Sequence, residues 1–290
     1  MACGWTCSGL RWTPGGPVLV WGGGRRSVLV RGRRIAFGVA GDGVRRCVGA
    51  RGHACPVRAA VPARGTGARC AQCARLDRAH SVAADTFAGD PRLYRVYLAW
   101  FGPDMVKVGI TAVERGPARL LEQGAVCFSW LGTGPLMAAR RTEELLRAAL
   151  AVPDRIPYAR KRAVRAGLPG ERAERAAQVR ELHARAVALE GWPESLVREP
   201  CRPVDHFTVF GLGDAPPAAG AVLGLRAGGS VDGELVAAAG PDLHLAVPGR
   251  GAVVLDTRLM TGWELGPAVA GSGGLTFPWR EFRVVPDALF

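Results

Sequence analysis

Four cysteines within 27 residues constrain this chain more than any other feature of its sequence. They are Cys47, Cys55, Cys70 and Cys73, and the last two form a Cys-x-x-Cys pair. A two-residue gap lets both sulfurs of such a pair face one tetrahedral metal ion, at about 2.3 Å for zinc. The spacing therefore predicts a structural four-cysteine zinc site that holds a segment too polar to form its own core, with His53 as an alternative ligand for Cys47 or Cys55.

Three other interpretations of the cysteines remain open at the level of sequence. A disulfide framework is not expected in a cytoplasmic chain, and the N-terminus lacks the pattern of a signal peptide. A redox Cys-x-x-Cys usually opens a helix after a strand, whereas this pair lies in arginine-rich loop sequence. Chance clustering is the third. No run approaches the eighteen apolar residues of a membrane span, so we expect a cytoplasmic protein without a membrane partner.

The positive charge of the chain is concentrated at its N-terminal end. Residues 1–80 contain fourteen arginines and only two acids, Asp42 and Asp77, whereas residues 81–290 are almost neutral. The use of 36 arginines and two lysines is typical of a GC-rich genome, but this does not explain the missing acids. The asymmetry favours a nucleic-acid partner, because each neutralised phosphate releases counterions. DNA and RNA are equally compatible with this pattern.

Composition shifts and turn signals divide the chain into an α+β arrangement of six segments. The Pro17–Trp21 and Ser27–Val30 runs predict short strands near the N-terminus, and the Phe207–Phe210 run predicts another beyond residue 200. A long helix is expected from about Glu171 to Glu190. The six segments are a small β segment (1–46), the zinc-binding module (47–80), a linker (81–93), an α/β module (94–150), an arginine-rich helical segment (151–200) and a β-rich C-terminal domain (201–290).

The most regular pattern lies in the 94–150 module, which predicts a small three-stranded sheet with flanking helices. Two alternating runs, 94–101 and 105–111, flank the three-residue loop Gly102-Pro103-Asp104. Pairing Phe101 with Met105 places apolar residues of both strands on one face, and a slip of one residue destroys this match. The same register places Tyr97 opposite Gly109 and Ala99 opposite Lys107 on the other face.

Two helices are expected in this module, and each carries a charged candidate. The first runs from about Glu114 to Gln123 and carries Arg115 and Arg119; if Pro117 takes the first helical position, only Arg119 is firmly helical. The second runs from about Leu136 to Leu150. Its apolar stripe contains Glu143, an acid that is costly there unless paired or metal-bound. In a purely structural alternative, Glu143 forms an ion pair with Arg140 or Arg147 on the helix surface.

These residues, in this order, resemble the GIY-YIG nuclease superfamily. The resemblance covers about residues 94–150 and rests on Val96-Tyr97, Lys107-Val108-Gly109, a helical arginine and a glutamate on the next helix. The strand-strand-helix-strand-helix frame resembles that superfamily too, which implies a mixed three-stranded sheet. Most of the chain also resembles an uncharacterised bacterial domain family with an N-terminal four-cysteine cluster, including the segment from Asp256 to Trp263.

The nuclease resemblance implies hydrolysis of phosphodiesters with one Mg²⁺ or Mn²⁺ ion. It implies that Glu143 binds the metal, that Arg119 or Arg115 holds the transition-state oxygens, and that Tyr97 orients or deprotonates water. The second motif tyrosine of that superfamily is replaced here by Lys107, which suits an electrostatic clamp better than a base. No fingerprint of an organic cofactor occurs.

Three functions therefore follow from the sequence as hypotheses. The first is a metal-dependent nuclease-like protein whose zinc-stabilised basic segment binds nucleic acid. The second is a non-catalytic zinc-containing nucleic-acid-binding protein on the same scaffold. The third is an enzyme acting on another phosphate-containing substrate, with selectivity supplied by the C-terminal β-rich domain. Replacement of Glu143 separates the first two, because it abolishes cleavage but leaves nucleic-acid affinity intact if the protein is a nuclease.

Overall fold

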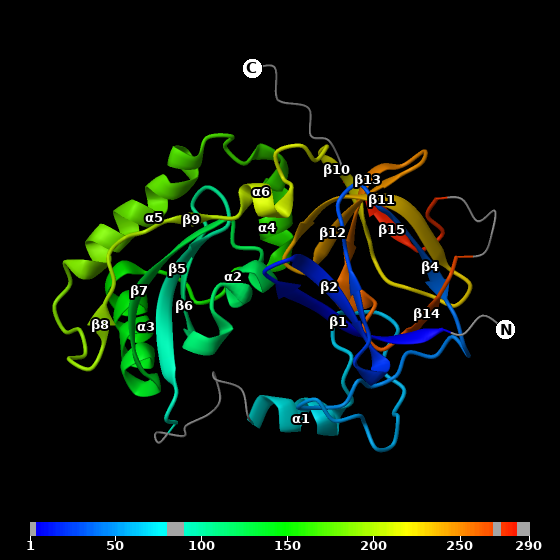
Figure 1. Cartoon of the computed structure of the whole chain (residues 1–290), viewed down its shortest axis with the longest axis horizontal. Helices are drawn as coiled ribbons and strands as arrows, with labels where there is room; N and C mark the ends of the chain where they lie inside the picture. Colours follow the sequence, from blue (N-terminus) through cyan, green and yellow to red (C-terminus); the bar gives the residue numbers. More distant parts are fainter. Residues whose placement is uncertain (1–3, 80–89, 269–273, 283–290) are drawn as a thin grey trace. The chain divides into compact units, whose positions relative to one another are not determined.

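The computed structural model describes residues 4–79, 90–268 and 274–282, and within them the chain forms two compact units. One unit combines residues 1–80 with 214–290, and the other spans residues 81–213. Figure 1 shows that N-terminal strands, in blue, and C-terminal strands, in orange and red, belong to this first unit. None of the described helices is long and apolar enough to cross a membrane.

The first unit is built on a ten-stranded sheet that combines strands from the N-terminal and C-terminal parts of the sequence. Its strand order is β15-β10-β13-β12-β11-β4-β14-β1-β2-β3. The strands are β1 (Trp5–Thr13), β2 (Gly16–Trp21), β3 (Arg26–Val28), β4 (Arg34–Val39), β10 (Ala218–Val222), β11 (Ser230–Ala239), β12 (Asp242–Val247), β13 (Gly251–Asp256), β14 (Glu264–Gly266) and β15 (Trp279–Glu281).

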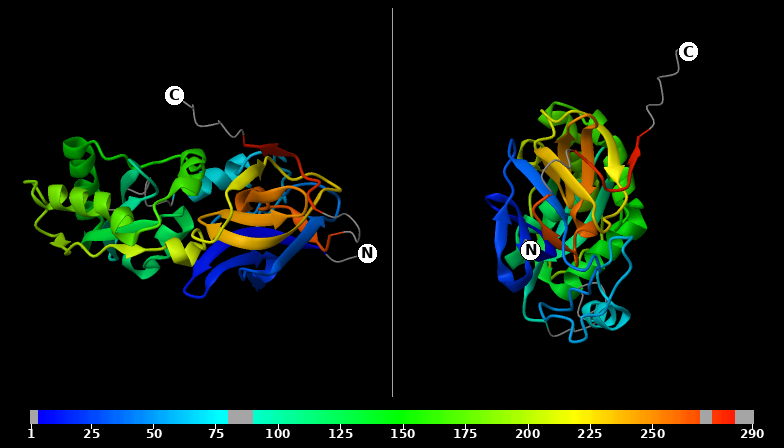
Figure 2. Two further views of the ribbon diagram at one scale, coloured as in Figure 1. Left: turned by 90° about the horizontal axis from the view of Figure 1, so that it is seen from above. Right: turned by 90° about the vertical axis from the view of Figure 1, so that its right-hand side faces the viewer.

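Long-range pairings join the N-terminal strands to the C-terminal ones. Strand β4 pairs with β11 and β14, and β1 pairs with β14. In both views of Figure 2 the blue N-terminal strands lie beside the yellow and orange C-terminal strands. The expected separation of segment 1–46 from segment 201–290 is wrong, because strands from residues 1–46 and 214–290 share one sheet. Residues 201–213 belong to the other unit. The expected strands at residues 17–21 and 27–30 correspond to β2 and β3.

The second unit contains a five-stranded sheet rather than the predicted three-stranded one. Strands β5 (Leu93–Trp100), β6 (Val106–Ala112) and β7 (Cys127–Pro135) form its centre. Two-residue strands, β8 (Val197–Arg198) and β9 (Val204–Asp205), pair with β7. Every pairing in this sheet is antiparallel, so the expected mixed sheet is wrong. The expected linker over residues 81–93 lies largely outside the described residues.

The predicted register of the β5–β6 hairpin is confirmed residue by residue. Trp100 pairs with Val106, Tyr97 with Gly109, and Ala99 with Lys107. The apolar face of the hairpin is buried with residues of the helices α3 (Leu136–Leu150) and α5 (Arg172–Val187). Figure 1 shows both helices on one side of the sheet. Alternation of side chains along the strands therefore sends Tyr97 and Lys107 to the opposite face.

The opposite face of this sheet is covered by shorter elements. Helix α2 (Ala118–Gln123) follows a 3₁₀ turn at Val113–Arg115 and ends at Gly124, a left-handed residue with φ of 70°. Helix α4 (Tyr158–Val164) lies near it. Leu120 of α2 joins Tyr97, Ala99 and other residues in a second apolar cluster. Both faces of the sheet are thus buried, and polar groups between them need partners.

One predicted strand of the C-terminal region is a helix. The Phe207–Phe210 run forms the four-residue helix α6, and the backbone N–H of Phe207 donates to the Asp205 carboxylate at 3.1 Å. Gly211 ends the helix with φ of 72°. An acceptor before the run and a left-handed glycine after it are helix signals that outweigh a short apolar alternation.

Candidate functional site

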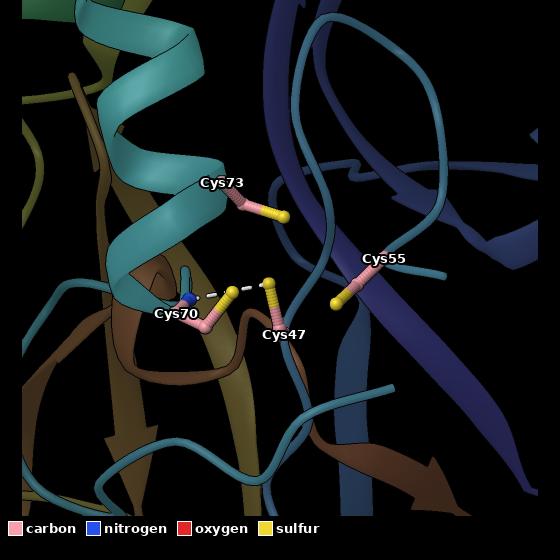
Figure 3. A group of neighbouring side chains, drawn as sticks. All are labelled: Cys47, Cys55, Cys70 and Cys73. Atoms are coloured by element: carbon pink, nitrogen blue, oxygen red, sulfur yellow. Dashed lines mark hydrogen bonds between the residues drawn. The ribbon is translucent and has the colours of Figure 1, made fainter. Parts of the chain in front are cut away.

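The four predicted cysteine ligands come together in the first unit. Their sulfur atoms all lie within 4.8 Å of one another, and Cys47, Cys55 and Cys73 are buried while Cys70 is half-buried. Figure 3 shows the four side chains converging from two loops and from the start of helix α1 (Ala71–Ala79). These distances allow one tetrahedral ion to contact all four sulfurs, so the cluster could bind a metal ion such as zinc. His53 is exposed and lies outside this group of four.

Backbone N–H groups point at the cysteine sulfurs and favour their thiolate form. The N–H groups of Gly49 and Cys70 donate to Cys47 Sγ at 3.4 and 3.2 Å, and the second bond is drawn in Figure 3. Backbone donors from Ala59 and Val57 lower the pKa of Cys55 to about 7. Burial raises the pKa of Cys73 to about 12, an effect that a bound cation reverses because a coordinating thiol is deprotonated.

The loop that holds Cys47 and Cys55 depends on one glycine. Gly49 has φ of 80°, and a Cβ atom placed on it lies 1.8 Å from the carbonyl oxygen of His53. The backbone N–H of Ala50 and the carbonyl of His53 pair at 3.1 Å, which closes a tight hairpin between the two cysteines. No other residue fits at position 49 without moving the hairpin. The wide spacing of Cys47 and Cys55 is therefore taken up by this turn.

Arg45 ties the cysteine module to the β-sheet, and sequence reasoning missed it. It is 1 % exposed, and its guanidinium donates to four backbone carbonyls. Those acceptors are the carbonyl oxygens of Thr261, Pro62, Gly65 and Arg258, at 2.8–3.0 Å. Two belong to the loop after Cys55 and two to the Asp256–Trp263 segment. In the sequence, resemblance alone singles out the Asp256–Trp263 segment. Its carbonyls have a structural role, because they accept hydrogen bonds from Arg45.

In the second unit, the structure brings several of the sequence-predicted residues to one place. Tyr97 on β5 is 1 % exposed, and its hydroxyl accepts a hydrogen bond from Gln123 Nε2 at 2.8 Å. Lys107 on β6 lies with its Nζ 5.7 Å from the centre of the Tyr97 ring. Gly109 makes room for the phenol, since a Cβ atom there lies 2.4 Å from the Tyr97 hydroxyl.

The pKa values of this group show that its charges act on one another. Burial raises the pKa of Tyr97, and hydrogen bonding with Gln123 and the charge of Arg119 oppose that rise. Burial lowers the pKa of Lys107 to about 8, with Arg119 adding to the effect and Glu143 opposing it. Burial also raises the pKa of Glu143, and Lys107 gives the largest opposing effect. The four side chains therefore form one electrostatic cluster, the Tyr97 cluster (Tyr97, Lys107, Arg119, Glu143).

The structure separates the two candidate arginines. Arg115 lies in the 3₁₀ turn, is exposed and pairs with Glu122, whereas Arg119 lies in α2 and acts on Tyr97 and Lys107. Pro117 precedes α2 directly, which matches the shorter of the two predicted helices. On α3, Glu144 bonds Arg147 at 3.3 Å, so Arg147 is not a dedicated partner of Glu143.

Three residues of the Tyr97 cluster's surroundings were not predicted. Asp154 supplies its carbonyl to Lys107 Nζ at 3.0 Å, and its carboxylate raises the pKa of Glu143. Gln123 holds Tyr97, and its carbonyl accepts from the buried Lys161 at 3.0 Å. No local pattern marks Asp154, because a loop distant in sequence brings it to β6.

The same sheet face continues past Tyr97 to a second polar group. The Arg95 guanidinium lies 5.0 Å from the centre of the Trp130 ring, and Trp130 contacts Tyr97 edge-on at 6.2 Å. Arg95 pairs across the strands with Thr111. Within the described residues, Arg95 Nε and Thr111 Oγ1 are buried without a hydrogen-bond partner. Arg95 Nε nevertheless lies 3.5 Å from Glu199 Oε1 in an ion pair, which partly offsets its burial.

The fold and the cysteine cluster together define an α+β protein of two units with a four-cysteine group able to bind a metal. The chain belongs to the family described as protein of unknown function DUF2797, which it matches over residues 32–265. No curated protein and no solved structure matches the chain significantly.

Proposed function

We propose that this protein is a nuclease-like phosphodiesterase of the GIY-YIG type, with a zinc-stabilised basic segment that binds its nucleic-acid substrate. The observation that carries the proposal is that Lys107 and Arg119 lie beside Tyr97 and that Glu143 is near enough to act on the pKa values of Tyr97 and Lys107. These residues lie far apart in sequence, and nothing in the packing of an apolar core requires a cation pair and a carboxylate there. Two cations and an acid in a half-buried place suit a phosphodiester whose negative charge increases during hydrolysis.

The residues of this chain have distinct roles in the proposed reaction. Arg119 and Lys107 bind the phosphate oxygens, Arg119 through the planar donors of its guanidinium and Lys107 as a point charge. Tyr97 orients the attacking water through its hydroxyl, because burial keeps its proton on at neutral pH. Gln123 and Gly109 fix the phenol in position.

Glu143 fits a hard divalent cation such as Mg²⁺ or Mn²⁺. Among the described residues its carboxylate makes no hydrogen bond or ion pair, although the side chain is partly buried. The positive charge of Lys107 lowers its pKa and so partly offsets the effect of burial. Carboxylate oxygens are the ligands that these cations prefer. A bound cation would polarise the phosphate. The cysteine cluster, by contrast, is a sulfur site that suits zinc in a structural role, since all four positions are taken by protein.

A second candidate function is nucleic-acid binding without cleavage. Its support is the burial of Tyr97 to 1 % exposure beneath Gln123, together with Lys107 in the place of a second tyrosine. A phenol so enclosed stabilises the sheet face whether or not it contacts water. In this case the Tyr97 cluster binds a phosphate and releases it unchanged.

A cleavage assay on labelled DNA and RNA with Mg²⁺ or Mn²⁺ separates the two candidates. The wild type should cut, Glu143→Gln should reduce the rate at least about 100-fold, and its neighbour Glu144→Gln should leave the rate within about twofold. Arg119→Ala and Arg115→Ala form a second matched pair, with loss expected only for Arg119. Binding measured in parallel should survive Glu143→Gln. Binding without cleavage by the wild type contradicts the first candidate and supports the second.

A further inference from the structure

The surface where β1, β2 and β3 begin and end combines an exposed and a half-buried tryptophan ring with exposed arginines. Trp5, at the start of β1, is 42 % exposed, and its ring lies 6.0 Å from that of Trp21 in an edge-on arrangement. The guanidinium of Arg25 lies 5.0 Å from the centre of the Trp5 ring. Trp21 is held in place because its Nε1 donates to Ser27 Oγ at 2.9 Å. The exposed Trp5 ring therefore lies against a half-buried Trp21 ring whose orientation is fixed by this hydrogen bond.

A glycine turn lies directly beside these rings. Gly22, Gly23 and Gly24 link β2 to β3, and the backbone N–H of Trp21 closes the turn by donating to the carbonyl of Arg25 at 2.9 Å. Gly23 and Gly24 have φ of 74° and 79°, and a Cβ atom at either would meet nothing within 4 Å. The turn is exposed, so a ligand can approach bare backbone there. These glycines are not followed by the helix that a nucleotide-binding fingerprint requires, so they are not such a fingerprint. What they offer a ligand is exposed backbone without side chains.

The electrostatic surroundings of this surface are one-sided. Arg25 and Arg26 are exposed, and neither forms an ion pair within the described part of the chain. Asp42 is the one acid in residues 1–46, and it pairs with Arg46. Glu264 lies nearby on β14, opposite Thr6. Arginines without acidic partners around an aromatic ring match a ligand that carries both negative charge and flat apolar faces.

We propose that Trp5, Trp21 and Arg25, with Arg26 and the Gly22–Gly24 turn, form a platform for an unpaired nucleotide of a single-stranded nucleic acid. The base stacks on the Trp5–Arg25 pair, and the adjoining phosphate contacts Arg26 and the bare backbone of the turn. Bases inside a duplex have both faces covered by their neighbours and cannot use this platform. The inference rests on the proposed nucleic-acid function and adds to it a preference for unpaired strands.

The test compares binding of labelled single strands of DNA and RNA with binding of the matching duplex, using the full-length zinc-loaded protein in magnesium-free buffer. Trp5→Leu should weaken single-strand binding about tenfold, as expected for one lost base–aromatic stack, and leave duplex binding within about twofold. Trp5→Phe should retain most of the affinity. Arg26→Ala should weaken binding to both and lower the salt dependence by about one ion.

A matched control exists in the same unit. Trp279 carries the Arg250 guanidinium at 5.2 Å from its ring centre, so Trp279→Leu removes a similar pair away from the glycine turn. Melting curves show whether each variant is folded. Equal losses for Trp5→Leu and Trp279→Leu, or equal losses for single strand and duplex, overturn the platform while leaving nucleic-acid binding in place. A wild type that binds neither form overturns the platform together with the proposed function.

Discussion

Arg45 shows how a single residue can join two parts of a fold that are far apart in sequence. Its guanidinium satisfies four carbonyls from two loops while the side chain is 1 % exposed. In the sequence, Arg45 is one of fourteen arginines in a basic segment, and nothing distinguishes it from the others. Its burial depends on loops 17 and more than 200 residues away, which no local pattern reveals.

Replacing Arg45 by Leu should lower the free energy of unfolding by about 3 kcal/mol or more, because each unpaired buried carbonyl costs about 1–3 kcal/mol. Arg46→Ala is the control, since it removes only an exposed pair with Asp42 that is worth at most about 1 kcal/mol. Denaturant titration measures both. Equal losses for the two variants would show that the Arg45 contacts do not hold the cysteine module.

Lys107 gives a prediction about pH. Burial sets its folded pKa at about 8, below the value of about 10.4 for a free lysine. Between these values the unfolded chain binds more protons than the folded one, so stability rises with pH across this window. The free energy of unfolding of the wild type should rise by about 1–3 kcal/mol across this window. The Lys107→Met variant has no titrating group at this position, so it should lack this rise. Urea titrations from about pH 7.5 to about pH 10.5 compare the two slopes; parallel slopes contradict the prediction.

At the scale of elements, the β5–β6 hairpin and helix α3 were the most predictable parts of the molecule. Strict alternation on both sides of a three-residue loop left one register that places the alternating apolar residues of both strands on one face, and the structure has it. Helix α3 begins and ends where its apolar stripe does. Strands β8 and β9 were missed because two residues carry no periodicity, and they exist only where β7 offers an edge.

The register of this hairpin places Gly109 directly opposite Tyr97, where only a residue without a side chain leaves room for the phenol. Gly109→Ala places a Cβ atom 2.4 Å from the Tyr97 hydroxyl, so the phenol must leave its bond to Gln123. We expect a loss of about 1–3 kcal/mol in stability from overpacking. Combining it with Tyr97→Leu should recover part of this loss, because the smaller side chain removes the clash. A double-mutant cycle measures the coupling; strict additivity would mean that the two side chains do not compete for space.

At the scale of the whole molecule, the C-terminal strands pair with the N-terminal strands in one sheet. Strands β1 and β4 find their partners in β11 and β14, more than 190 residues later, with the entire second unit in between. Sequence patterns identified strands at both ends but not that they share a sheet, because pairing at such separation leaves no local trace. The cysteine module lies between these strands in sequence and is tied to the sheet by Arg45 and by the bond from the Arg46 N–H to the Gly262 carbonyl at 2.8 Å.

This arrangement predicts that metal loss affects one unit and spares the other. The cysteine cluster and its small core belong to the first unit, whereas the apolar clusters around β5 to β7 contain none of the four cysteines. Elemental analysis should find one zinc per chain. A strong chelator should then remove hydrogen-exchange protection from residues 45–79 and from the Asp256–Trp263 segment that packs on them, while the amides of β5, β6 and β7 stay protected.

Two cysteine variants make the experiment specific to the metal. Cys73→Ser removes a ligand and should reproduce the effect of the chelator, because three sulfurs bind zinc more weakly than four and the module has little core of its own. Cys201→Ser changes a half-buried cysteine outside the cluster and should leave zinc content and protection unchanged. If chelation exposes β5 to β7 as much as the cysteine module, the two units unfold as one, and the zinc stabilises the whole chain rather than its basic first unit.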